Sequence, residues 1–142
     1  MAAIEWTNDL SVQVDVIDEQ HKMLIKHLGD FATAVASHQG PGAIISTLDF
    51  LIEYTNFHFE EEEKHMKRSS YSGLEQQISQ HEAFKKTLAD MESDFKEDGA
   101  THELAGDIHT LLVNWLVTHI KTVDVEFGKF LAENGIIIRN EI

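Results

Sequence analysis

The chain has 142 residues, a net charge of -14 from 25 acidic and 11 basic residues, nine histidines and no cysteine. This length can bury a substantial core, and we expect a single domain over residues 1–142. The acidic balance makes nucleic acid a poor partner, because phosphate backbones are bound by clusters of Lys and Arg. Without cysteine the chain cannot form thiolate zinc or iron–sulfur sites. Any bound metal must therefore be held by nitrogen and oxygen.

The sequence predicts neither a membrane span nor secretion. No apolar run approaches the roughly 20 residues that a transmembrane helix needs. Residues 1–6 lack the basic start and the apolar stretch of a signal peptide. We therefore expect a cytoplasmic protein with no membrane partner.

Hydrophobic periodicity divides the chain into an arm, four helices and a short apolar tail. Val12, Val14 and Val16 alternate with polar residues, which is typical of extended chain, so we expect residues 1–17 to form an arm across the helices. Apolar residues spaced three and four apart then predict helices over about residues 18–37, 43–67, 74–96 and 102–131. Asp18 and Thr101 are the expected N-caps of the first and fourth helices.

Short connections rich in glycine, serine or acidic residues separate these helices, at residues 39–42, 69–73 and 97–99. Four amphipathic helices joined in this way form an up-down-up-down bundle. The expected fold is therefore all-α, an antiparallel four-helix bundle with an extended N-terminal arm. Such bundles build metal sites from side chains that face the core.

Each expected helix has a histidine on its apolar face, and two of these have a carboxylate nearby. The six residues are His21, His58, Glu62, His81, His119 and Asp124. A lone histidine on an apolar face is more often a hydrogen-bonded core residue than a ligand. Four of them at compatible heights in an antiparallel bundle instead favour a shared site. Glu62 follows His58 by four residues, so both lie on one helix face.

Asp124 joins this site only if the helix changes locally. It follows His119 by five residues, and five residues rotate the chain by about 140° on an α-helix, away from the shared face. A π-bulge would turn Asp124 inward.

The donor set favours iron, manganese or zinc over calcium or magnesium. Two carboxylates with four imidazoles exceed the needs of one tetrahedral ion, so a two-metal centre with bridging carboxylates fits better. The other histidines lack this combination of face and height, and we interpret them as surface or supporting residues: His27, His38, His65, His102 and His109. A metal-free bundle is the remaining alternative.

The ordered motifs resemble those of the bacterial hemerythrins, an oxygen-binding, non-haem di-iron family. The resemblance rests on Trp6-Thr7, Leu10-Ser11-Val12, Ile17-Asp18-Glu19-Gln20-His21, His58-Phe59 with Glu62, His81 with Phe84, and Trp115-Leu116 before His119 and Asp124. It implies that His21 and His58 bind an iron with an open position for O2. It further implies that His81 and His119 bind a second iron. Glu62 and Asp124 would bridge the two ions together with an oxo or hydroxo group.

One position departs from the family pattern. The family's third helix offers two histidines four residues apart, whereas here Gln77 stands four residues before His81. The amide oxygen of Gln77, or water, would replace one imidazole of the second iron. We expect weaker binding of that iron and faster oxidation of the ferrous centre; alternatively, Gln77 coordinates and oxygen binding survives.

The resemblance implies a monomer that binds O2 reversibly, for storage, delivery or sensing, at two iron ions that alternate between Fe2+ and Fe3+. The alternative is a di-iron peroxidase or oxidase favoured by Gln77, with peroxide or small anions at the iron. We expect an oxygen-binding protein before an enzyme. An apolar pocket for O2 is expected near the ligands, lined by Leu24, Ile25, Leu28, Trp115 and Ile120.

Overall fold

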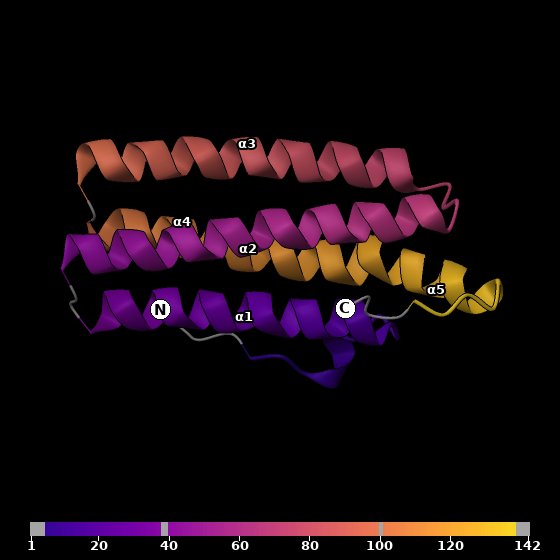
Figure 1. Cartoon of the computed structure of the whole chain (residues 1–142). Helices are drawn as coiled ribbons and strands as arrows, with labels where there is room; N and C mark the ends of the chain where they lie inside the picture. The colour runs from indigo at the N-terminus through magenta and orange to yellow at the C-terminus, as the bar shows by residue number, and fades with distance from the viewer. Residues whose placement is uncertain (1–4, 38–39, 100, 139–142) are drawn as a thin grey trace.

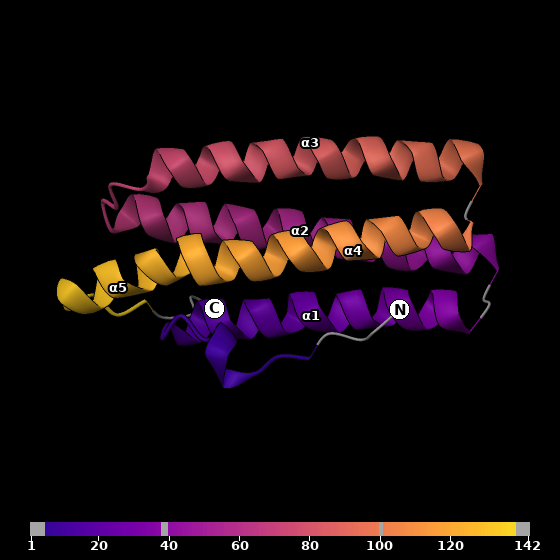
Figure 2. The same cartoon turned by 180° about the vertical axis from the view of Figure 1, so that it is seen from behind.

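The computed structural model describes residues 5–37, 40–99 and 101–138, which form a bundle of long antiparallel helices (Figure 1). Helix α1 spans Asp15–Ala36, α2 spans Pro41–Arg68 and α3 spans Leu74–Asp98. The fourth long element consists of α4 (His102–His119), the π-helical turn η2 (Ile120–Asp124) and α5 (Val125–Glu133). The expected all-α, up-down-up-down bundle is confirmed, and Figure 2 shows the same arrangement from behind.

Helix α2 begins two residues earlier than the sequence pattern indicates, at Pro41. Proline fits the first turn of a helix because its missing N–H would have no partner there. Pro41, which the sequence pattern placed in the connection, is therefore the first residue of the second helix. At the same end of the bundle, the expected cap of α4 is confirmed, since Thr101 Oγ1 accepts a hydrogen bond from the Leu104 N–H at 3.2 Å.

The prediction that Asp18 caps the first helix is wrong. Helix α1 already begins at Asp15, and Asp18 lies buried in its first turn. Its carboxylate accepts hydrogen bonds from the Val12 N–H at 2.9 Å and from Ser11 Oγ at 2.6 Å. Asp18 therefore fixes the N-terminal arm against α1.

The arm is non-helical over much of its length but is not uniformly extended. It contains the short 3-10 helix η1 (Asn8–Leu10), and Gln13 has a φ of 63°. Val12 and Val14 are buried against the bundle. The arm passes very close to α5 at Gly128, where a Cβ atom would lie 2.1 Å from the Val12 carbonyl oxygen. Only glycine permits this approach.

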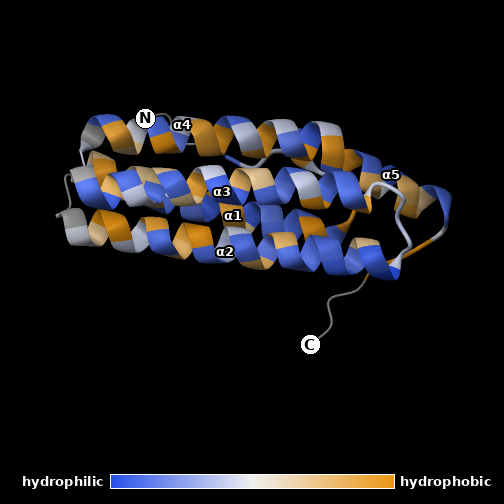
Figure 3. Ribbon diagram, turned by 90° about the horizontal axis from the view of Figure 1, so that it is seen from above, coloured by the Kyte–Doolittle hydropathy of each residue, from blue (hydrophilic) through white to orange (hydrophobic). Residues whose placement is uncertain are grey.

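The helices are amphipathic, and Figure 3 shows hydrophobic and hydrophilic residues alternating along them. Each apolar face contributes to one core, whose largest fully buried side chains include Phe31, Phe59, Phe95 and Phe127. Burying such a side chain stabilises the fold by roughly 1.5–3 kcal/mol. Ile136 and Ile138 of the tail also pack on the core, whereas Ile137 is 78% exposed.

Most of the buried polar side chains gather in the half of the bundle where α1 begins and α2 ends. This half holds the histidines and carboxylates singled out from the sequence. None of the helices in the described ranges combines the length and apolar composition that crossing a bilayer requires.

Candidate metal centre

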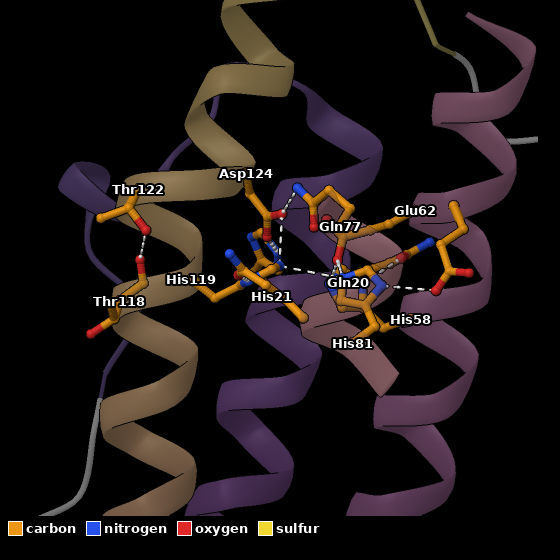
Figure 4. Close-up of polar contacts among 12 residues, drawn as sticks. Gln20, His21, His58, Glu62, Gln77, His81, Thr118, His119, Thr122 and Asp124 are labelled. Carbon is orange, nitrogen blue, oxygen red and sulfur yellow. Dashed lines mark hydrogen bonds and ion pairs between the residues drawn. The ribbon is translucent and has the colours of Figure 1, made fainter. Parts of the chain in front are cut away.

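The seven residues predicted as metal ligands meet inside the bundle (Figure 4). They are His21 from α1, His58 and Glu62 from α2, Gln77 and His81 from α3, His119 from α4, and Asp124 from η2. Each is at most 3% exposed. Side chains from four antiparallel helices therefore converge at one height, as the sequence positions indicated.

The first group of donors consists of His21, His58, Glu62 and Asp124, whose ligand atoms all lie within 4.8 Å of one another. His58 Nε2 is 2.6 Å from Glu62 Oε1. His21 Nε2 is 3.1 Å from Asp124 Oδ2. Two imidazoles and two carboxylates thus surround one position that could hold an ion.

The second group consists of Glu62, His81 and His119. The Nε2 atoms of the two histidines are 3.3 Å apart, and His81 Nε2 is 3.8 Å from Glu62 Oε1. His119 Nε2 is also 3.2 Å from Asp124 Oδ1. Glu62 therefore belongs to both groups, and Asp124 directs one oxygen to each. Two carboxylates between two pairs of imidazoles is an arrangement suited to bridging two ions.

The π-helical turn brings Asp124 into this centre. The Val125 N–H bonds to the Ile120 carbonyl oxygen five residues earlier, as in a π-helix. The Thr122 hydroxyl donates to the Thr118 carbonyl oxygen at 2.6 Å within the same segment (Figure 4). The hypothesis that a π-bulge turns Asp124 inward is confirmed.

Three of the imidazoles are oriented by an oxygen acceptor at Nδ1. The pairs are His58 with Gln20 Oε1 at 2.7 Å, His81 with Glu63 Oε2 at 2.8 Å, and His119 with Gln80 Oε1 at 3.0 Å. An acceptor at Nδ1 holds the proton there and leaves the Nε2 lone pair free for a metal. The sequence analysis missed these three acceptors. A signal was present, because each stands next to a predicted ligand in the chain, and metal-bound histidines commonly have such a partner.

Aromatic stacking also fixes the planes of two imidazoles. The His81 ring lies on Phe59, with centroids 4.0 Å apart and an interplanar angle of 7°. The His119 ring lies on Trp115 at 4.4 Å and 12°. Trp115 in turn stacks on Phe84. These contacts restrict rotation of both rings and preorganise their Nε2 atoms.

The protonation equilibria of the buried groups suit a cation. Burial lowers the pKa of His58 to about 4, and burial together with nearby His119 lowers the pKa of His81 to about 3. Both imidazoles are thus neutral at pH 7, the form that binds metals. Burial and the neighbouring Asp124 raise the pKa of Glu62 well above its usual value. Burial acts likewise on Asp124, but the nearby His119 and His21 imidazoles hold its pKa well below the usual range.

Several polar atoms at the centre have no hydrogen bond within the described part of the chain. They are both ring nitrogens of His21, both carboxylate oxygens of Glu62, Asp124 Oδ2 and Gln77 Oε1. Leaving such groups buried and unsatisfied costs free energy, most of all for a carboxylate. Cations between them would satisfy the carboxylates and the free Nε2 lone pairs. The nitrogen and oxygen donors therefore fit a pair of transition-metal ions.

Gln77 contacts the carboxylate of Asp124. Its Nε2 donates a hydrogen bond to Asp124 Oδ1 at 3.0 Å, while its Oε1 is buried and unbonded (Figure 4). The amide thus occupies the place of a third donor beside the His81 and His119 pair. Its oxygen remains available to an ion or a water molecule.

A small apolar cavity of about 20 Å³ adjoins the centre. Its lining residues are Leu24, Leu28, Leu51, Thr55, Phe59, Phe84, Leu112, Trp115 and Leu116. Leu24, Leu28 and Trp115 agree with the expected pocket. Ile25 and Ile120 are buried but do not line it, so that part of the prediction is wrong. The Thr55 hydroxyl donates its proton to the Leu51 carbonyl oxygen at 2.7 Å, so this proton is not available to water in the cavity.

The other histidines that the structure describes lie outside both donor groups. His27 is half-buried beside Tyr54. His65 and His109 are buried, so a surface position is wrong for these two. His38 and the side chain of His102 lie outside what the structure describes.

Comparisons with known proteins agree with this arrangement. The Hemerythrin HHE cation binding domain family matches residues 12–131. The bacteriohemerythrin of Stenotrophomonas maltophilia is 32% identical over 128 residues, which cover 90% of this chain and 81% of that protein. The bacteriohemerythrin of Methylococcus capsulatus is 29% identical over 133 residues, covering 93% and 99%. A crystal structure of wild-type hemerythrin superposes with a TM-score of 0.82 at 26% identity, covering 92% of this chain and 99% of the other. The chain belongs to the hemerythrin family.

Proposed function

We propose that this protein binds O2 reversibly at two iron ions held in the bundle core. The observation that carries the proposal is the pair of buried carboxylates shared between two pairs of imidazoles, next to an apolar cavity. When bound between these residues, two ferrous ions would supply the two electrons that O2 takes up on binding and gives back on release. The role of the protein is then to hold the ions, to orient their ligands and to exclude water.

Each predicted ligand has a role in this proposal. His21 and His58 hold the first ion, and His81 and His119 hold the second, with Gln77 Oε1 or a water molecule as an additional donor. Glu62 and Asp124 would be shared between the two ions, together with an oxo or hydroxo group. The short distances from each carboxylate to imidazoles of both pairs support the bridging roles.

The surroundings of the site support reversible binding. Exclusion of water disfavours proton-coupled loss of reduced oxygen, and the ligand side chains are almost completely buried. The lining residues of the cavity lie within about two turns of ligands on the same helices, such as Leu24 beside His21 and Phe84 beside His81. An apolar cavity beside the ligands suits a small apolar gas better than a charged substrate.

The relatives carry the names bacteriohemerythrin and myohemerythrin, which favours an oxygen-binding protein over an enzyme. Storage, delivery and sensing are all compatible with this activity, and we propose a cytoplasmic monomer. The comparisons do not favour a peroxidase or oxidase. Gln77 is the one observation that keeps this second candidate testable, because an exchangeable position on the second ion would admit further ligands.

Anaerobic loading with ferrous iron followed by optical spectroscopy tests the proposal. Admission of O2 should produce a visible absorption band that disappears when O2 is removed and returns over repeated cycles. Glu62→Ala, which deletes a bridging carboxylate, should abolish the band. Irreversible conversion to the ferric form at the first exposure would contradict reversible binding. Sustained turnover of added hydrogen peroxide would instead support the peroxidase alternative.

A further inference from the structure

The three imidazoles with an Nδ1 acceptor are not supported equally. His58 and His119 bond to the neutral amide oxygens of Gln20 and Gln80, whereas His81 bonds to a carboxylate oxygen. That carboxylate, Glu63, is the neighbour of the bridging Glu62 in α2 but extends to the opposite ring nitrogen of His81. Of the three acceptors, the charged one therefore serves His81, a member of the His81 and His119 pair.

A carboxylate changes the donor strength of an imidazole more than an amide does. Hydrogen bonds with an ionised partner are roughly twice as strong as neutral ones. A carboxylate at Nδ1 draws the ring proton toward itself and raises the electron density and basicity of Nε2, the atom that faces the centre. The side chain of Glu63 is only 24% exposed and His81 is fully buried, so water screens this interaction less than it screens a surface pair.

Glu63 supports a histidine that lies next to Gln77, the position that departs from the family pattern. His81 follows Gln77 by one helical turn in α3, and both lie beside the second donor group. That group has an amide where an imidazole is expected from the resemblance. The stacking of His81 on Phe59 at 4.0 Å keeps its Nδ1 directed at Glu63.

We infer that Glu63 is a positioning residue that strengthens His81 as a ligand of the second ion and so offsets the weaker donor Gln77. The inference rests on the proposed di-iron function. Supporting residues of this kind typically change metal affinity by about 10- to 100-fold. Loss of the Glu63 charge should therefore lower the affinity for the second ion by about this factor and leave the affinity for the first ion nearly unchanged.

The variant Glu63→Gln tests this inference because glutamine still accepts the hydrogen bond from His81 Nδ1 and makes all three acceptors amides. Glu60→Gln is the matched control, since Glu60 is exposed on the same helix and its replacement changes the net charge equally. Both variants are compared with the unaltered protein by anaerobic titration with Co2+, whose spectrum reports imidazole ligands, and by equilibrium dialysis with Fe2+. Circular dichroism of the metal-free proteins verifies that each variant is folded.

The expected result is a weaker second binding step in Glu63→Gln alone, with both steps unchanged in Glu60→Gln. Identical titrations of the two variants would overturn the inference. If the unaltered protein binds fewer than two ions, the proposed function fails, whatever the variants do. Two tightly bound ions in the unaltered protein and in Glu63→Gln alike would leave the proposed function standing and remove only the inference.

A double-mutant cycle tests whether Glu63 offsets the weaker donor Gln77 or supports His81 to the same extent whichever residue stands at position 77. In a Gln77→His background the second ion has a third imidazole and depends less on His81, so Glu63→Gln should cost clearly less than in the unaltered protein. An equal loss in both backgrounds would overturn the compensating role of Glu63.

Discussion

The substitution Gln77→His would restore an imidazole at the second donor group. In the structure, Gln77 is fully buried and its Nε2 donates to Asp124 Oδ1 at 3.0 Å. Its Oε1 has no hydrogen bond to any described residue. A histidine at this position directs a stronger donor at the second ion but removes the amide that supports the bridging carboxylate.

The substitution should therefore lower the stability of the metal-free protein but strengthen metal binding in the loaded protein. Loss of a hydrogen bond to a charged group costs about 1.5–3 kcal/mol, so the metal-free variant should be less stable by up to this amount. Supporting residues alone change metal affinity about 10- to 100-fold, and a direct ligand should reach at least the upper value. A 100-fold gain corresponds to about 2.7 kcal/mol at the second position. The loaded variant should therefore be the more resistant to chelators.

Two assays examine this prediction. Denaturant unfolding of the metal-free proteins measures the loss of stability. The rate at which the oxygenated protein converts to the ferric form measures the benefit of the added imidazole, which should appear as a longer lifetime of the oxygenated form. Gln76→His is the control, because the same replacement is made at an exposed neighbouring position. An unchanged lifetime in Gln77→His, with the second ion bound no more tightly, would refute the reasoning that a missing imidazole weakens this site.

Two further predictions concern the stability of the protein. Burial lowers the pKa of His58 to about 4 and of His81 to about 3, from an ordinary value of 6.5. The unfolded chain therefore takes up these protons at higher pH than the folded chain. The free energy of unfolding is therefore at its full value above about pH 6.5 and falls as the pH drops toward 3. For His58 alone, the loss of unfolding free energy amounts to about 3 kcal/mol. Urea midpoints of the metal-free protein should fall over this range and fall less steeply in His58→Gln; equal slopes would contradict the assignment. Separately, Gly128→Ala should lower the unfolding free energy by about 1–3 kcal/mol, because the new Cβ would collide with the Val12 carbonyl oxygen. An unchanged thermal midpoint would contradict the tight packing of the arm.

Much of this architecture follows from local patterns in the chain. Apolar residues at helical spacing placed the four helices, and His21, His58, His81 and His119 stood on their inner faces. Glu62 followed from its four-residue distance to His58. These inferences succeeded because a regular helix fixes the direction of a side chain from its position in the sequence.

Other features depend on contacts between distant segments or on a local departure from regular geometry. The five-residue spacing of His119 and Asp124 only suggested a π-bulge, since nothing in the residues themselves specifies where an α-helix widens. Asp18 has the chemistry of an N-cap, yet tertiary contacts with the arm determined its actual role. The cavity differs from the expected pocket because its lining depends on how four helices pack: Phe59 and Phe84 line it, whereas Ile25 and Ile120 do not.

We propose that two ions lie between Glu62 and Asp124, each held by a separate pair of histidines. A crystal structure of the anaerobically iron-loaded protein, with anomalous data collected at the iron edge, tests this arrangement. We expect two anomalous peaks, one beside His21 and His58 and one beside His81 and His119, with Gln77 Oε1 or a water molecule at the second. A single peak, or none, in a fully folded and iron-loaded protein would contradict it.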